Sequence, residues 1–175
     1  YKRQTVEHAY KIGRCIGWYY GARQGRKARI VVGKDTRRSS YMLESGMVSG
    51  LVASGADAYM LHVIPTPGLS YETTDGAFDG GVMITASHNP YTDNGIKLVN
   101  SQGFKMEEPL LQLIEQYIDG EYAEEVPMVS GDAIGATVDY MQGRNRYIAH
   151  LIASANFSLQ GVKVGLDCAN GAASS

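Results

Sequence analysis

The first 64 residues alternate between helically spaced apolar positions and short continuous apolar runs. Residues 5–22 carry apolar side chains at helical spacing and predict an amphipathic helix. Residues 28–33 (ARIVVG) form a short apolar run, which is typical of a strand buried on both faces. A second stripe of helically spaced apolar residues follows and predicts a helix that is capped by Ser39 or Ser40. Residues 57–64 are then predicted to form a strand. This order predicts a βαβ unit with a right-handed crossover.

The rest of the chain continues this alternation. A proline and glycine break at residues 65–68 (PTPG) interrupts it, and residues 119–138 are mixed in character and predict a loop. The remaining elements are predicted as a short helix at 69–74, strands at 81–85 and 96–99, helices at 109–118 and 140–155, and a strand at 162–168.

These elements predict the fold class. Strands that alternate with helices predict an α/β domain of three layers, α/β/α, with a four-stranded mixed sheet in the middle. The last predicted strand and the residues after it resemble the beginning of such a domain, so we expect the first strand of a second similar domain there. The predicted boundaries are a first domain over residues 1–157 and the start of a truncated second domain over residues 158–175.

Composition narrows the class of protein. The chain is 44% hydrophobic and 19% charged with a net charge of −2, which is typical of a globular protein. No basic run interleaves with aromatic residues, so we expect no nucleic-acid partner. The apolar runs are far shorter than the roughly 20 residues of a membrane helix, and the N-terminus has no signal-peptide core. Cys15 and Cys168 form no disulfide framework, which favours a cytoplasmic location.

Reactive side chains concentrate in residues 85–90 (TASHNP), which follow a predicted buried strand. Ligands bind at the carboxyl ends of the strands in open α/β sheets. The hydroxyl, imidazole and amide of Ser87, His88 and Asn89 would suit a reactive site at that edge. The alternative is a polar turn in which Ser87 and Asn89 only satisfy local backbone groups.

Lys97 lies on the next predicted strand, within an otherwise apolar run (IKLV). The intervening turn can bring its ammonium back towards Ser87, where it would stabilise an anion or transfer a proton. A lysine on a strand is more often a solvated residue whose stem packs on the surface. The sequence contains no dinucleotide-binding, P-loop or nucleophile-elbow motif, so those site classes are not supported.

Five segments together resemble the α-D-phosphohexomutase superfamily in their order and spacing. The resemblance covers nearly the whole chain, and residues 85–90 are its most specific part because they match the superfamily's phosphoserine loop. The other four segments are residues 31–37 (VVGKDTR), 65–68 (PTPG), 94–97 (NGIK) and 167–171 (DCANG).

Within the superfamily, residues 41–45 (YMLES) and 93–97 (DNGIK) are most similar to the bacterial phosphoglucosamine mutase branch. This resemblance implies an isomerase-class phosphotransferase that interconverts glucosamine 6-phosphate and glucosamine 1-phosphate through a phosphoserine and a bound bisphosphate. A phosphomannomutase or phosphoglucomutase, or a non-catalytic phosphosugar-binding domain, is the alternative. The expected partner is a small-molecule phosphosugar, and a homodimer is left open.

The resemblance also implies residue roles: catalysis by Ser87, His88 and Lys97, and phosphate binding by Asn89 and Arg37. Ser87 would carry the phosphoryl group. Lys97 is expected to act beside the phosphoserine as a cation that donates a proton or a hydrogen bond. For Arg37 an alternative is open, in which it braces the loop through an ion pair with Asp35.

Magnesium is the implied cofactor. A phosphoserine adds about −1.5 to −2 charges, which a cation must neutralise before a second phosphate approaches. The resemblance implies one Mg²⁺, held by the phosphate of Ser87 and by three aspartates outside this chain, with a hexose 1,6-bisphosphate as activator. The family's N-terminal arginine loop and later sugar-binding loops are also expected outside residues 1–175, so we expect the chain alone to be inactive.

Overall fold

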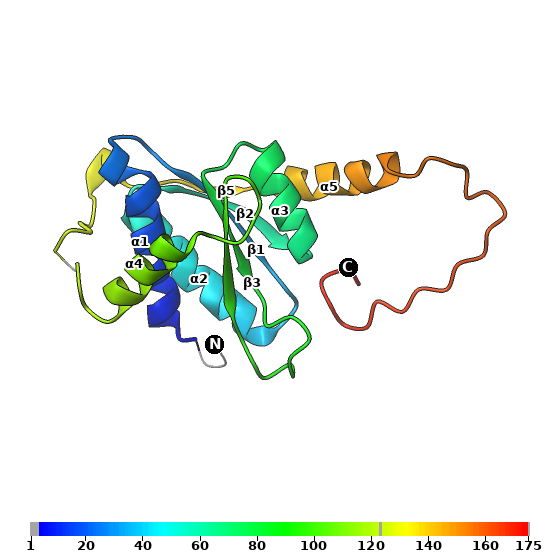
Figure 1. Cartoon of the computed structure of the whole chain (residues 1–175), viewed down its shortest axis with the longest axis horizontal. Helices are drawn as coiled ribbons and strands as arrows, with labels where there is room; N and C mark the ends of the chain where they lie inside the picture. Colours follow the sequence, from blue (N-terminus) through cyan, green and yellow to red (C-terminus); the bar gives the residue numbers. More distant parts are fainter. Residues whose placement is uncertain (1–3, 123, 175) are drawn as a thin grey trace.

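The predicted alternation of strands and helices is present in the structure, a computed structural model that describes residues 4–122 and 124–174 (Figure 1). Among the described residues no helix is long and apolar enough to span a membrane. The helices are α1 (Val6–Tyr20), α2 (Arg38–Ala53), α3 (Thr66–Asp75), α4 (Glu108–Ile118) and α5 (Met141–Ala153), and the strands are β1 (Arg29–Lys34), β2 (Asp57–Val63), β3 (Gly80–Ile84), β4 (Ile96–Asn100) and β5 (Thr137–Asp139).

The strands form one mixed sheet in the order β4-β3-β1-β2-β5. The central β1 pairs in parallel with β2 and β3, β2 pairs in parallel with β5, and β4 runs antiparallel to β3. β1, α2 and β2 form the predicted βαβ unit, and α3 then carries the chain from β2 to β3 on the other side of β1. The strand order therefore reverses at β1, and the carboxyl ends of β1 and β3 lie side by side at one edge.

Helices cover both faces of this sheet, which confirms the three-layer α/β/α prediction. α1, α2 and α4 pack on one face, and α3 and α5 pack on the other (Figure 1). Ile30 and Val32 of β1 join the core on the first face, whereas Val31 joins the core on the second. This division follows from the pleat of a strand, in which successive side chains point to opposite faces. Both cores thus hold β1 and fix the position of the residues that follow it.

Glycines allow α1 and α2 to pack very closely. A Cβ on Gly13 would lie 2.4 Å from the carbonyl oxygen of Met47, and a Cβ on Gly50 would lie 2.1 Å from the carbonyl oxygen of Tyr10. A side chain at either position would force the two helix backbones apart, because protein interiors hold little free volume. This contact anchors α2, which begins directly after the site residues 35–37.

The sheet has one strand more than the four predicted. β5 lies within residues 119–138, where the sequence pattern predicts a loop, and it pairs with residues 58–60 of β2. Val138 is the one apolar residue of this three-residue strand and is half-buried. So short a segment carries too little hydrophobic periodicity to predict a strand. Pairing with β2, which is distant in sequence, determines its conformation.

Two helix starts differ from the prediction. α3 begins at Thr66, within residues 65–68 where a break is predicted. Pro67 stands in its first turn, where the missing N–H costs no helical hydrogen bond. α2 begins at Arg38 with no side-chain cap, so the prediction that Ser39 or Ser40 caps this helix is wrong.

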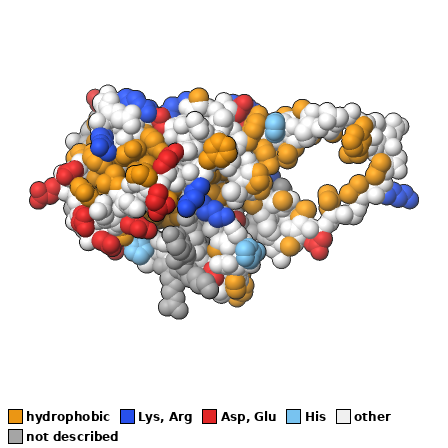
Figure 2. All heavy atoms as spheres, in the orientation of Figure 1, with side chains coloured by type: hydrophobic (Ala, Val, Ile, Leu, Met, Phe, Trp, Pro, Cys, Tyr) orange, Lys and Arg blue, Asp and Glu red, His pale blue; other side chains and the backbone are white. Residues whose placement is uncertain are grey.

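Residues 162–168 do not form a strand, contrary to the prediction. They belong to an extended segment after α5, along which Figure 2 shows spaced hydrophobic side chains. Val162, Val164 and Leu166 are 59%, 66% and 83% exposed. A strand needs a neighbour to complete its hydrogen bonds, and within the described part of the chain none lies beside this segment. The predicted domain boundary between residues 157 and 158 stays a prediction.

Candidate active site at the carboxyl edge of the sheet

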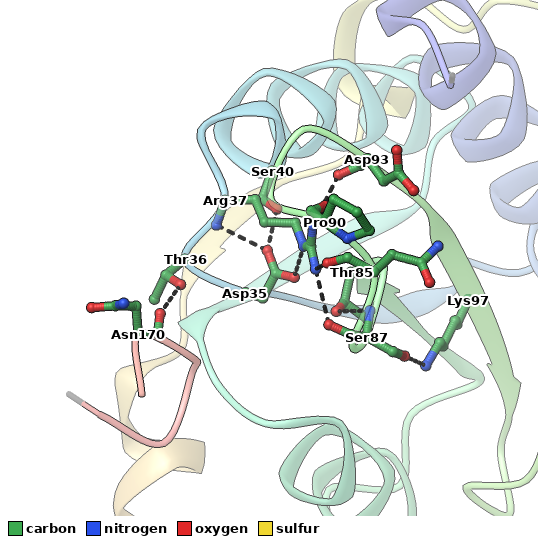
Figure 3. Close-up of polar contacts among 11 residues, drawn as sticks. Asp35, Thr36, Arg37, Ser40, Thr85, Ser87, Pro90, Asp93, Lys97 and Asn170 are labelled. Carbon is green, nitrogen blue, oxygen red and sulfur yellow. Dashed lines mark hydrogen bonds and ion pairs between the residues drawn. The ribbon is translucent and has the colours of Figure 1, made fainter. Parts of the chain in front are cut away.

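The segments identified in the sequence meet at one edge of the sheet. Residues 35–37 follow β1, residues 65–68 follow β2, and residues 85–93 follow β3. The Thr36 hydroxyl donates a 2.5 Å hydrogen bond to the backbone carbonyl of Asn170, which brings a further motif to this edge (Figure 3). Ligands bind at this edge in open α/β sheets, where the strand order reverses. We therefore take it as the candidate site.

Ser87 stands at the corner of a tight turn. The backbone N–H of Asn89 donates to the Ala86 carbonyl at 3.1 Å, which closes the turn. Ser87 has a φ of 54°, in the left-handed region that usually takes glycine. This conformation costs on the order of 1–3 kcal/mol and persists only where the surroundings fix it. The Thr85 hydroxyl accepts the Ser87 N–H at 3.0 Å, and the Ser87 side chain is left exposed at the edge.

Lys97 is in direct contact with Ser87. Its Nζ donates a hydrogen bond of 2.5 Å to the Ser87 Oγ (Figure 3). β4 runs antiparallel to β3 with Lys97 opposite Met83, so the lysine starts near the end of β3, within reach of the loop that follows. Both residues are exposed and accessible to a ligand. The structure thus brings together the two residues that the sequence pattern placed near each other, and their catalytic roles stay predictions.

His88 and Asn89 follow Ser87 on the same turn. His88 is exposed beside Ser87, whereas Asn89 is half-buried. Asn89 engages the loop through its backbone, because its N–H closes the turn and its carbonyl accepts from Arg37. Both residues therefore lie next to Ser87 at this edge, and their functions stay predictions.

Arg37 contacts this loop from the end of β1. Its guanidinium donates hydrogen bonds to the Asp35 carboxylate at 2.9 Å and to the backbone carbonyls of Ser87 (2.9 Å), Asn89 (2.8 Å), Asp93 (3.2 Å) and Pro90. Only 10% of the Arg37 side chain is exposed. This arrangement favours the bracing role that the sequence left open for Arg37 over the phosphate-binding role.

Asp35 accepts hydrogen bonds from several neighbours. Its Oδ1 accepts from the Ser40 hydroxyl at 2.6 Å and from the Arg37 backbone N–H at 3.0 Å. Burial raises the pKa of Asp35, but hydrogen bonds from Ser40, Arg37 and Thr85 outweigh this effect and hold the pKa below its ordinary value. The carboxylate therefore stays ionised opposite Arg37. The sequence pattern assigned no such role to Ser40 or Thr85.

A buried ion pair lies beneath the site. Lys34, the last residue of β1, pairs with Glu44 of α2, and its ammonium lies 3.9 Å from the centre of the Tyr41 ring. The pair fixes α2 against the end of β1, next to residues 35–37. The sequence pattern did not predict this pair. The available signal was a glutamate at a position of α2 that falls on its buried stripe.

The described side chains supply few possible ligands for the magnesium ion that the resemblance implies. Among residues 4–122 and 124–174, no group of three or more His, Cys, Asp or Glu could hold a metal ion. Asp35 is already engaged by Arg37 and Ser40. Ser87 is exposed, and its predicted role as one ligand through a phosphate oxygen stays a prediction. Aspartate ligands remain an expectation for residues outside this chain.

The three-layer fold and the serine loop where the strand order reverses define a phosphohexomutase-type domain. Residues 1–125 match the family model described as phosphoglucomutase/phosphomannomutase, alpha/beta/alpha domain I. The chain therefore belongs to the phosphoglucomutase/phosphomannomutase family.

Curated relatives share one name. The chain is 59% identical over 172 residues to a phosphoglucosamine mutase of Lachnoclostridium phytofermentans, and 55% identical over 170 residues to one of Lachnospira eligens. These alignments cover 98% and 97% of this chain but 38% of each relative, so the chain spans well under half of their length. The resemblance to the phosphoglucosamine mutase branch is thereby confirmed.

Solved structures share the fold. A phosphoglucomutase/phosphomannomutase family protein from Burkholderia thailandensis superposes with a TM-score of 0.70 at 23% identity, covering 86% of this chain and 32% of that one. A putative phosphomannomutase from Thermus thermophilus gives a TM-score of 0.68 at 25% identity, covering 87% and 33%. The first of these, below 25% identity, supports the fold alone.

Proposed function

We propose that this chain carries the phosphoserine loop of a phosphosugar mutase that interconverts glucosamine 6-phosphate and glucosamine 1-phosphate. The proposal depends above all on the hydrogen bond from Lys97 Nζ to Ser87 Oγ. Ser87 makes this contact from a left-handed backbone conformation in the loop after β3. Family membership supports a phosphohexomutase, and the shared name of the curated relatives supports glucosamine phosphates as substrates.

Ser87 carries a phosphoryl group at the start of each proposed cycle. A hydroxyl of the bound sugar phosphate attacks the phosphorus and gives up its proton, the bond from phosphorus to Ser87 Oγ breaks, and Ser87 Oγ takes up one proton in turn, so the step is proton-neutral. The sugar is then a bisphosphate, which turns over in the site. Its other phosphate returns to Ser87 Oγ and the isomeric monophosphate leaves. Such a transfer depends mainly on positioning and on charge stabilisation.

Lys97 stabilises the oxygen that gains negative charge. When the bond to phosphorus breaks, that charge develops on Ser87 Oγ, to which the Lys97 ammonium already donates. A preorganised donor of this kind stabilises the transition state more than the ground state. His88, exposed beside Ser87, is the proposed residue for proton exchange with the sugar hydroxyl or for contact with its phosphate.

Magnesium, when bound, would supply the positive charge that neutralises the phosphoserine. Of the described residues, phosphorylated Ser87 is the one that would hold it. Asn89 is proposed to contact phosphate at the same turn, and a hexose 1,6-bisphosphate would restore a phosphate lost from Ser87. The other ligands and the sugar-binding residues are expected outside this chain, so we predict that the chain alone does not turn over substrate.

Two alternatives remain. A phosphomannomutase or phosphoglucomutase is favoured by the description of the family model and by the printed name of the Thermus thermophilus structure. A non-catalytic phosphosugar-binding domain would retain the fold but would not need a donor aimed at Ser87 Oγ. A cytoplasmic location and a homodimer stay predictions.

The phosphoserine is tested by mass spectrometry. In the full-length protein purified from cells, we expect a fraction with one added phosphate that maps to Ser87. The Ser87→Ala variant provides the control and will lack both the phosphate and the activity. Active protein with phosphate at other residues and none at Ser87 would contradict the proposal.

The substrate is tested by side-by-side kinetics of the full-length protein. We expect kcat/KM to be higher for glucosamine 6-phosphate than for glucose 6-phosphate or mannose 6-phosphate. A preference for mannose 6-phosphate would support the phosphomannomutase alternative. Binding of all three sugars without turnover would support the non-catalytic alternative.

A further inference from the structure

Arg37 uses every N–H group of its guanidinium within the protein. Arginine has five such groups. One donates to the Asp35 carboxylate, and the other four donate to backbone carbonyls in the loop after β3 (Figure 3). With 10% of its side chain exposed, Arg37 has no donor left for a phosphate unless one of these contacts breaks.

The four carbonyls belong to two consecutive turns of the loop. Those of Ser87 and Asn89 lie in the first turn. Those of Pro90 and Asp93 lie in the second, which is closed by the Asp93 N–H donating to the Pro90 carbonyl at 3.0 Å. One planar guanidinium therefore joins both turns to each other and to the end of β1. All four carbonyls lie at or after the strained corner at Ser87, so a single group holds the loop from this corner onwards.

Asp35 holds Arg37 in place. Its Oδ2 accepts from the Arg37 Nε at 2.9 Å, and its Oδ1 accepts from the Arg37 backbone N–H and the Ser40 hydroxyl. The backbone N–H of Asp35 donates to the Ile84 carbonyl at 3.0 Å, which ties this aspartate to the end of β3. Asp35 and Arg37 together form a bracket, called here the Asp35–Arg37 bracket, from the sheet to Ser87.

The charges of the bracket support the same conclusion. The Asp35 carboxylate lies against the guanidinium and offsets much of its positive charge, so the pair attracts an anion weakly. An arginine that binds phosphate presents an open fork of two N–H groups to it. Here that fork faces backbone carbonyls, and among the described residues it is Lys97 that brings a cation to Ser87 Oγ.

We propose that Arg37 is a positioning residue that, with Asp35, holds Ser87 in the left-handed conformation presenting Oγ to Lys97, and that Arg37 does not bind the substrate phosphate. This role rests on the proposed mutase function. A strained backbone persists only while its surroundings fix it. Without the bracket, Ser87 relaxes and its Oγ moves away from Lys97, although no group that touches the substrate has been removed.

The test compares two neighbouring arginines in the full-length protein. Arg37→Lys keeps the charge but not the five-donor fork, and Arg37→Met removes both. Arg38→Lys and Arg38→Met make the same changes at an exposed position. For each variant, kcat and KM for glucosamine 6-phosphate, deuterium exchange of the peptide covering residues 86–97, and the thermal unfolding temperature are measured.

We expect both Arg37 variants to lose activity through kcat. A reacting atom displaced by about 1 Å costs on the order of 100-fold in rate, while KM stays within about threefold because substrate binding is intact. Arg37→Lys does not rescue kcat, since lysine cannot make the five contacts. Deuterium exchange of residues 86–97 accelerates in both Arg37 variants, and the Arg38 variants match the wild type in all three measurements.

Other outcomes overturn the proposal. A rise in KM of about tenfold or more at unchanged kcat, reversed in Arg37→Lys, would show that Arg37 binds the substrate phosphate. Unchanged exchange of residues 86–97 would show that Arg37 does not hold the loop. If Arg37→Met fails to fold, Arg37→Lys decides by the same criteria. If the wild type has no mutase turnover, the proposed function fails, whereas the exchange measurement still decides whether Arg37 holds the loop.

Discussion

Lys34 and Glu44 form an ion pair in which 5% and 10% of the two side chains are exposed. Oε1 of Glu44 is buried and has no hydrogen-bond partner among the described residues, so this carboxylate depends on Lys34 through Oε2. The pair joins the end of β1 to α2 directly beneath the residues that contact the serine loop. Its energetics therefore affect the stability of the site as well as that of the domain.

Removing the cation of this pair is expected to destabilise the domain. Lys34→Met leaves the Glu44 carboxylate buried without a counter-charge, which typically costs about 3–5 kcal/mol. Adding Glu44→Leu removes the unpaired charge and is expected to recover most of that loss. Urea unfolding of the chain, followed by circular dichroism, measures both variants. Equal midpoints for Lys34→Met and the wild type would contradict the prediction.

Lys97→Ala is expected to act on rate and leave stability unchanged. Its side chain is exposed and donates to Ser87 Oγ, so the loss of this donor lowers kcat of the full-length protein by a factor on the order of 10² to 10³. If the contact operates in the transition state, kcat and kcat/KM fall together. The exposed Lys105 provides a matched control, and Lys105→Ala retains wild-type rates. A loss confined to KM would limit Lys97 to ground-state binding.

The stability supplied by Asp35 depends on pH. The pKa of Asp35 is below its ordinary value of about 3.9. Its stabilising contribution is therefore fully present above that ordinary value and is lost as the pH falls through the lowered pKa. We expect the difference in unfolding free energy between wild type and Asp35→Asn to be constant from neutral pH down to about pH 5 and to shrink at lower pH.

Ser40→Ala tests the cause of this lowered pKa. The Ser40 hydroxyl donates to Asp35 Oδ1, so its loss raises the pKa of Asp35 towards the ordinary value. The acid loss of stability due to Asp35 starts near the same pH in both proteins, because the ordinary pKa sets its onset, but it is smaller and ends at a higher pH in Ser40→Ala than in the wild type. Acid titrations followed by fluorescence or circular dichroism compare the two. An unchanged acid transition would show that the other hydrogen bonds suffice.

Gly50→Ala tests the close packing of α1 on α2. Alanine is favoured over glycine in a helix by about 1 kcal/mol, so propensity alone predicts stabilisation. The added Cβ would lie 2.1 Å from the Tyr10 carbonyl oxygen, a backbone atom that moves only with α1. We expect a net loss of about 1–3 kcal/mol in urea unfolding. Ser49→Ala, at the adjacent exposed position, is the control and changes stability little.

Local sequence predicts the elements that carry a strong hydrophobic pattern. β1 and β3 are apolar runs next to glycine, and both lie where the pattern places them, with the serine loop at their carboxyl edge. β5 and residues 162–168 are the opposite cases. β5 has almost no hydrophobic pattern, but it pairs with β2. Residues 162–168 have a clear hydrophobic pattern, but no strand among the described residues lies beside them. Strand formation depends on that distant partner, which periodicity cannot report.

The site was predictable only in part for a related reason. The contact of Lys97 with Ser87 joins two residues that lie ten positions apart in the sequence, so sequence proximity indicates it. The contacts of Arg37 are different, because four of its five acceptors are backbone carbonyls located 50 to 56 residues away. Every residue has such a carbonyl, and no side-chain identity marks those that Arg37 reaches.

The extended segment after α5 affects how the chain behaves in solution. Val162, Val164 and Leu166 expose apolar side chains on alternating positions, with no proline between them. A short segment of this kind can pair with the same segment of another molecule and start cross-β aggregation. At high concentration the isolated chain is therefore expected to associate through residues 162–166. A shortened chain that ends at Ala155 is expected to remain monomeric at concentrations where the longer one forms oligomers.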